Sequence, residues 1–230
     1  MTIKPSCRYI FPFPSISLPF LILCGSLAGP SIATAQSAEE GAFVILVGSD
    51  TFAVENFSRR ADQVDGEITG FAVGRLSYTM MIGPDAGVSS LSIRYWGPAT
   101  DMNGPPVQAA DLTVIDDTVL LQITTPPGIE EQRIASEAGA FLYINPSFVM
   151  TEQMVLYARA RGGESVDFPV FMAQGEDTAP ARVSSPTADS VTVTILGSPM
   201  QVVMDEQGRL ATASIPTQGV NVVRTGRQSF

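Results

Sequence analysis

The amino-acid sequence predicts a mainly β protein: one strongly curved antiparallel sheet, a β-clam or half-open barrel of roughly 11–12 strands, with one helix at about 147–160. Short runs of alternating apolar and polar residues recur from residue 42 onward, and Gly-, Pro- and Asp-rich turns separate them. A single later stretch has apolar residues at helical spacing.

The N-terminal residues 1–35 follow the plan of a secretory signal peptide. Lys4 and Arg8 form a basic start, an apolar stretch follows, and Ala33-Thr34-Ala35 offers small residues for cleavage. The apolar run is too short for a transmembrane helix and contains prolines. We therefore expect a periplasmic or secreted protein whose mature part, 36–230, is a single β-rich domain.

A second interpretation of the N-terminus concerns Cys24. Leu21-Ile22-Leu23-Cys24 resembles a bacterial lipoprotein box, although Leu23 occupies a position where a small residue is expected. In that case the mature chain would be an outer-membrane-associated lipoprotein with its lipid on Cys24.

The first half of the mature chain contains successive predicted strands, and 97–110 is the best candidate for a long surface loop because it holds three prolines. In the strand Val88 to Trp96, Leu91, Ile93 and Tyr95 fall on one side and Ser90, Ser92 and Arg94 on the other. We expect these strands at 42–47, 51–58, 66–74, 76–82, 88–96, 111–115, 118–124 and 141–144.

One helix is predicted at 147–160, with Asn145 as a possible cap and Gly162-Gly163 as its end. Phe148, Thr151, Val155 and Ala158 recur at helical spacing and predict one core-packing face. Strands resume at 166–174, 182–185, 190–196, 200–204, 209–215 and 220–224.

The residue composition excludes several kinds of active site. The chain contains no histidine, and its two cysteines (Cys7, Cys24) and one lysine (Lys4) lie in the predicted signal. The mature part therefore lacks the residues for Ser-His-Asp, Cys-His or Schiff-base catalysis and for zinc sites of imidazole or thiolate. A net charge of −10 argues against nucleic acid as a partner. We predict no cofactor and no metal site.

Two groups of residues are candidates for ligand binding. Glu55 lies among apolar residues of a predicted strand, where an inward carboxylate would have a raised pKa, although an outward, solvated position is the preferred interpretation. Arg94, Tyr95 and Trp96 at a strand end could line a pocket mouth, and Tyr78 could extend an apolar lining. Alternatively, Tyr95 belongs to the core, Arg94 faces water and Trp96 covers an edge.

The order of elements resembles the periplasmic β-clam proteins, which include lipoprotein-carrier and related lipid-handling families. The supporting segments are the opening strand pair around 48–55, the helix at 147–160 and the closing hairpin Asp205-Glu206-Gln207-Gly208-Arg209-Leu210. The resemblance implies a curved sheet with a helical lid and an apolar ligand, but it assigns a role to no residue.

These observations favour a non-enzymatic binding protein that holds an apolar or amphiphilic ligand, or a lipidated partner, in the hollow of its sheet. One alternative is a carboxylate-dependent hydrolase or isomerase with Glu55 as acid or base. Another is a structural or assembly subunit of the cell envelope that is bound through an exposed strand edge.

Overall fold

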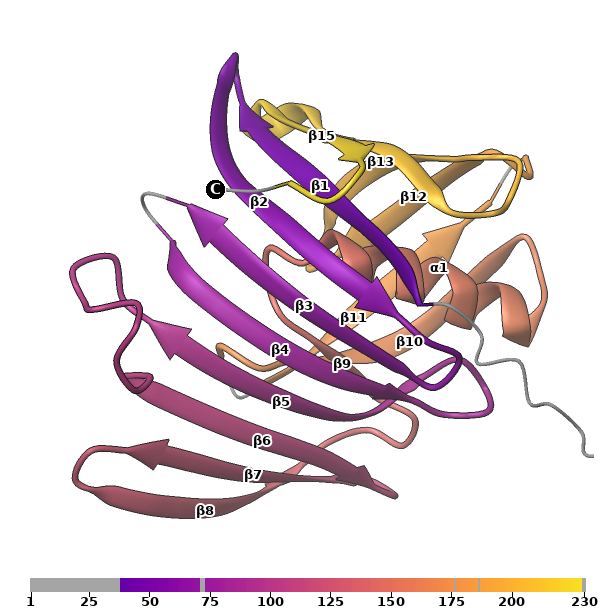
Figure 1. Ribbon diagram of the computed structural model, residues 1–230. Coiled ribbons are helices and arrows are strands. Elements are labelled where there is room, and N and C mark those ends of the chain that lie inside the picture. Colours follow the sequence, from indigo (N-terminus) through magenta and orange to yellow (C-terminus); the bar gives the residue numbers. More distant parts are fainter. Residues whose placement is uncertain (1–37, 71–72, 176, 186, 229–230) are drawn as a thin grey trace, which may run out of the picture. The chain divides into compact units, whose positions relative to one another are not determined.

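The computed structural model describes residues 38–70, 73–175, 177–185 and 187–228 (Figure 1). The predicted export signal, with Cys24, lies outside the described residues. In the described part, 15 strands form one large curved sheet that does not close, together with one α-helix and one short 3₁₀ helix.

The first eight strands form a continuous antiparallel meander from the middle of the sheet to one edge. They are β1 (Glu39–Val47), β2 (Asp50–Arg59), β3 (Gln63–Gly70), β4 (Gly74–Ile82), β5 (Val88–Trp96), β6 (Gln108–Ile115), β7 (Thr118–Thr125) and β8 (Gly128–Ala135).

The remaining strands build the other half of the sheet outward from β1. They are β9 (Phe141–Tyr143), β10 (Ser165–Met172), β11 (Asp177–Ser184), β12 (Ser190–Ile195), β13 (Ser198–Met204), β14 (Leu210–Ile215) and β15 (Val220–Thr225), with the 3₁₀ helix η1 (Pro216–Gln218) before β15. The last strand, β15, pairs with β1, and β9 pairs with β10 in parallel at the second edge.

The predicted fold class is confirmed. The predicted total of roughly 11–12 strands is too low: fourteen of the fifteen strands overlap the separate ranges predicted as strands, and one does not. The prediction missed β8, Gly-Ile-Glu-Glu-Gln-Arg-Ile-Ala, completely. This strand pairs with β7 and is mostly exposed on both faces, so its sequence lacks the alternation that marks a half-buried strand.

Helix α1 (Phe148–Arg161) begins one residue later than predicted, and Ser147, not Asn145, caps it. The Ser147 hydroxyl accepts a hydrogen bond from the Met150 N–H, and the backbone N–H of Gly162 bonds back to Arg159.

The buried surface of this helix is wider than the single core-packing face that the sequence predicts. Every residue from Phe148 to Val155 is buried, including Glu152 and Gln153, because α1 lies between β2 and the strands β10 to β12 (Figure 1). The helix is therefore part of the core inside the curved sheet, and its polar side chains need partners there.

Candidate functional site

A cavity of about 750 Å³ lies at the end of the curved sheet where β1 ends and β2 begins. Its walls come from both halves of the sheet and from the segment that leads into α1. Most of the lining side chains are apolar: Ile45, Val47, Phe52, Val73, Leu76, Ile93, Ala110, Leu121, Ile123, Ile144, Pro146, Phe148, Ala173, Met200, Ile215 and Val220.

The period-two pattern of the strands explains this lining. Ile93 and Tyr95 point inward from β5, and on the neighbouring strands Gln108 and Ala110 (β6) and Leu121 and Ile123 (β7) do the same. Residues two apart share a face of the sheet, so one inward row on each strand produces a continuous apolar wall.

The polar part of the lining consists of neutral groups. Among the described residues that line the cavity, none is charged, and hydrogen-bonding side chains come from Tyr95, Gln108, Tyr143, Asn145, Gln174 and Gln218. The Gln174 amide donates to the Asn145 carbonyl at 2.6 Å, which fixes one of these side chains. The cavity can therefore bind apolar groups and hydrogen-bond with a neutral polar group, but it offers no ion-pair partner.

Glu55 is fully buried, in contrast to the outward position that the sequence favoured. Its carboxylate accepts four hydrogen bonds: from the hydroxyls of Tyr78 (2.7 Å) and Ser147 (2.6 Å), and from the N–H groups of Phe148 (2.6 Å) and Val149 (3.1 Å). Burial raises the pKa of Glu55, while these four donors act in the opposite direction.

Glu55 thus caps the N-terminus of α1 from a neighbouring strand. The first N–H groups of a helix have no partner within the helix, and a carboxylate satisfies them and interacts favourably with the helix dipole. Neither Glu55 nor Tyr78 lines the cavity, so these two predicted ligand-binding residues are close to each other but away from the hollow.

The predicted group of Arg94, Tyr95 and Trp96 is divided between two faces of β5. Tyr95 lines the cavity, whereas Arg94 pairs with Asp111 at 3.1 Å in a second, polar depression on the other face of the sheet. Trp96 is mostly buried, donates from its indole N–H to the carbonyl of Gly104 at 2.8 Å, and stacks on Arg75 with 3.8 Å between the guanidinium carbon and the ring centroid.

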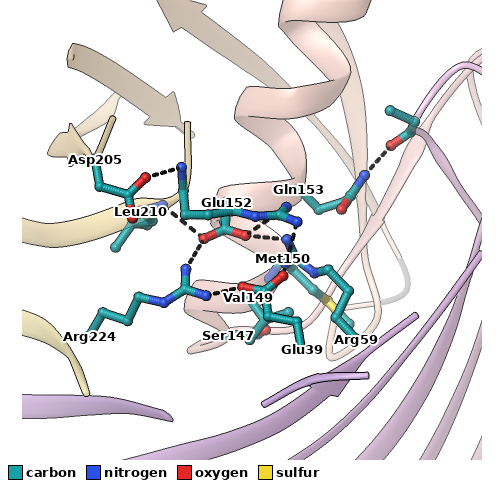
Figure 2. A network of polar contacts seen from close by, with 12 residues as sticks. Glu39, Arg59, Ser147, Val149, Met150, Glu152, Gln153, Asp205, Leu210 and Arg224 are labelled. Carbon is teal, nitrogen blue, oxygen red and sulfur yellow. Dashed lines mark hydrogen bonds and ion pairs between the residues drawn. The ribbon is translucent and has the colours of Figure 1, made fainter. Parts of the chain in front are cut away.

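A buried ion network holds the middle of α1 to the sheet (Figure 2). Glu152, which is fully buried, pairs with Arg59 of β2 and with Arg224 of β15, the latter at 2.8 Å. It also accepts a hydrogen bond from the Leu210 N–H at 2.8 Å. Sequence reasoning missed this network because Glu152 lies in a helix with a continuous buried surface, and nothing local to it identifies partners more than 50 residues away.

The network continues to the start of β1. Glu39 pairs with Arg224 and with Arg209, the latter at 2.9 Å, and Arg209 lies 3.6 Å from Glu152. Two nitrogens of Arg59, Nε and Nη2, are buried without a hydrogen-bond partner in the described residues. The Glu152 carboxylate, which pairs with Arg59 Nη1, therefore carries the main compensation for the Arg59 charge.

The described residues contain no group of three or more acidic, histidine or cysteine side chains placed to hold a metal ion. No helix within the described ranges has the length and apolar character needed to cross a membrane.

Comparison with known proteins gives a likeness of fold. No family model and no curated protein sequence matches the chain. A crystal structure of a DUF1089 family protein from Pseudomonas aeruginosa matches with a TM-score of 0.53 and 13% identity, over 74% of this chain and 92% of that one. A DUF1329 family protein from Desulfovibrio piger ATCC 29098 has a TM-score of 0.22 and 11% identity, over 82% of each chain. The first likeness supports the curved-sheet architecture.

Proposed function

We propose that this chain is an exported, non-enzymatic binding protein that holds an apolar or amphiphilic ligand in the cavity at the open end of its sheet. The observation that carries the proposal is the lining: a hollow of about 750 Å³ bounded mostly by apolar side chains and by neutral polar ones. Its volume is in the usual range for sites that enclose small molecules.

The absence of charge among the described lining residues narrows the ligand class. An alkyl or acyl chain gains free energy by leaving water for such a surface, whereas a buried ionic group without a partner is costly. The ligand is therefore a neutral apolar molecule, or an amphiphile whose apolar part enters the cavity. An acyl chain on a lipidated partner has the same chemistry.

The chain-length dependence of binding tests this proposal. A fluorescent neutral alkyl probe is bound to delipidated protein and displaced by linear alcohols of increasing length. Burial of one methylene group contributes about 0.8 kcal/mol to the binding free energy. Removal of two methylene groups from an enclosed chain should therefore raise the dissociation constant roughly tenfold. Affinity that does not depend on chain length, or no uptake of the probe, would contradict the proposal.

A cavity-filling variant connects the binding to this site. Ala110 lines the hollow and is half-buried, so Ala110→Phe should fill part of it and weaken probe binding at least about tenfold. The matched control is Ala61→Phe, at an exposed turn between β2 and β3, which should leave binding unchanged. Extraction of the natively exported protein, followed by mass spectrometry, distinguishes a bound small molecule from a lipidated protein partner.

A further inference from the structure

The open sheet has one long unpaired edge in its described part. Its two edge strands are β8 and β9. Strand β9 has three residues, all of them buried. Strand β8 lies at the edge beyond β7 (Figure 1), and its eight residues are largely exposed on both faces. The outer side of β8 therefore presents a row of backbone donors and acceptors to solvent.

Charged side chains on an edge strand usually prevent pairing with unrelated strands. On β8, Glu131 and Arg133 project from the same face because they are two residues apart. Glu131 accepts a hydrogen bond from Gln122 of the neighbouring strand at 3.0 Å, but Arg133 has no ion-pair partner among the described residues. An unpaired arginine thus lies beside a glutamate at an open edge.

We propose that β8 pairs with β8 of a second copy of this chain, antiparallel about a two-fold axis. In such a pair, opposite residues lie on the same face of the sheet, so the axis must pass through one residue and its own copy. With the axis at Gln132, Glu131 of each copy lies opposite Arg133 of the other, and Ile129 lies opposite Ala135.

The neighbouring registers lack this complementarity. An axis at Glu131 places the two copies of Glu131 against each other, and an axis at Arg133 does the same with the two arginines. The register at Gln132 thus joins the two sheets with two ion pairs and with Gln132 facing its own copy, and it extends the sheet by backbone hydrogen bonds.

Reversal of single charges tests the pairing without touching the cavity. The wild-type chain should form a concentration-dependent dimer in sedimentation experiments. Glu131→Arg places two arginines opposite two arginines, and Arg133→Glu places two glutamates opposite two glutamates, so each variant should raise the dimer dissociation constant at least about tenfold.

Complementation gives the decisive result. An equimolar mixture of Glu131→Arg and Arg133→Glu should form a heterodimer, and the double variant that carries both changes should recover the homodimer. The matched control is Glu137→Arg, an exposed position just beyond β8, which should dimerise like wild type. A wild-type chain that stays monomeric, or a dimer that neither single change weakens, would overturn the proposal; binding of the alkyl probe is scored separately and tests the cavity alone.

Discussion

Glu55 shows how one side chain can fix the position of an element far away in the sequence. It extends from β2 and accepts hydrogen bonds from the first two N–H groups of α1, more than 90 residues further along the chain. The same carboxylate also orients Ser147, which caps the helix itself. Glu55 has the carboxyl group that a catalytic acid would need, but its contacts are those of a residue that caps a helix.

Replacement of this carboxylate should damage the fold. In Glu55→Gln the amide NH₂ would face N–H and O–H donors, and we expect a loss of about 2–4 kcal/mol in the free energy of unfolding. Urea unfolding followed by circular dichroism measures this. The control Glu67→Gln, on the exposed face of β3, should change stability by less than about 0.5 kcal/mol. A Glu55→Gln protein as stable as wild type would mean that the cap contributes little.

Buried tyrosines give the fold a dependence on alkaline pH. Burial raises the pKa of Tyr143 to about 12, and burial together with the nearby Glu55 raises the pKa of Tyr78 well above its ordinary value. A group with a raised folded pKa stabilises the fold below its unfolded pKa, which is about 10 for tyrosine, and this contribution is lost as the pH rises through the folded value.

For Tyr143 we expect stability to fall between about pH 10 and pH 12, by about 1.4 kcal/mol per pH unit. Unfolding free energies measured across this range should fall less steeply in Tyr143→Phe than in wild type. Equal slopes in the two proteins would show that Tyr143 ionises as easily in the folded state as in the unfolded one.

At the scale of the elements, the strands that could be predicted are those with at least one buried face. In β5 the predicted alternation is confirmed, because Leu91 and Ile93 are buried and Ser90 and Ser92 are not. Strand β8 could not be predicted in this way, since its edge position buries neither face. The sequence pattern thus reports burial, and it indicates a strand only where at least one face is buried.

Helix α1 was predicted in position but not in environment. Its apolar stripe indicated one buried face, yet Glu152 and Gln153 are buried as well. The Gln153 amide donates to the Ala86 carbonyl at 2.8 Å, and Glu152 is paired with arginines from other strands. Such partners are set by the tertiary fold, so no reading of the local sequence could have supplied them.

At the scale of the whole described fold, the cavity and the ion network lie at different ends of the same strands. On β1, Ile45 and Val47 line the hollow, whereas Glu39 at the other end belongs to the network. Among the predicted site residues, only Tyr95 lines the cavity; Glu55 and Tyr78 are buried away from it, and Arg94 lies on the opposite face of the sheet. Which inward residues surround a hollow depends on how the sheet curves, and the period-two pattern does not encode that curvature.

Because the network joins α1 to strands from both halves of the sheet, its loss should weaken the whole described fold. Glu152→Gln leaves Arg59 buried without a full counter-charge, and we expect a destabilisation of about 3–5 kcal/mol, or a melting temperature lowered by roughly 10 °C. Trp96 is the single tryptophan and lies in β5, a strand that contributes nothing to the network. Its fluorescence and the far-ultraviolet circular dichroism should therefore report the same lowered midpoint if the two halves unfold together.

Two controls make this measurement specific. Arg182→Gln removes an exposed ion pair with Asp167 and should leave the midpoint nearly unchanged. Arg59→Met combined with Glu152→Met removes the two most deeply buried charges and should recover part of the stability, because apolar side chains carry no desolvation penalty. The recovery should be incomplete, because Arg224 keeps only Glu39 as a partner and the Leu210 N–H loses its acceptor. A Trp96 midpoint that stays at the wild-type value in Glu152→Gln, while the circular dichroism midpoint falls, would show that the strands around β5 unfold independently of the helix. The ion network would then hold together only α1 and the strands that it contacts, β1, β2, β14 and β15.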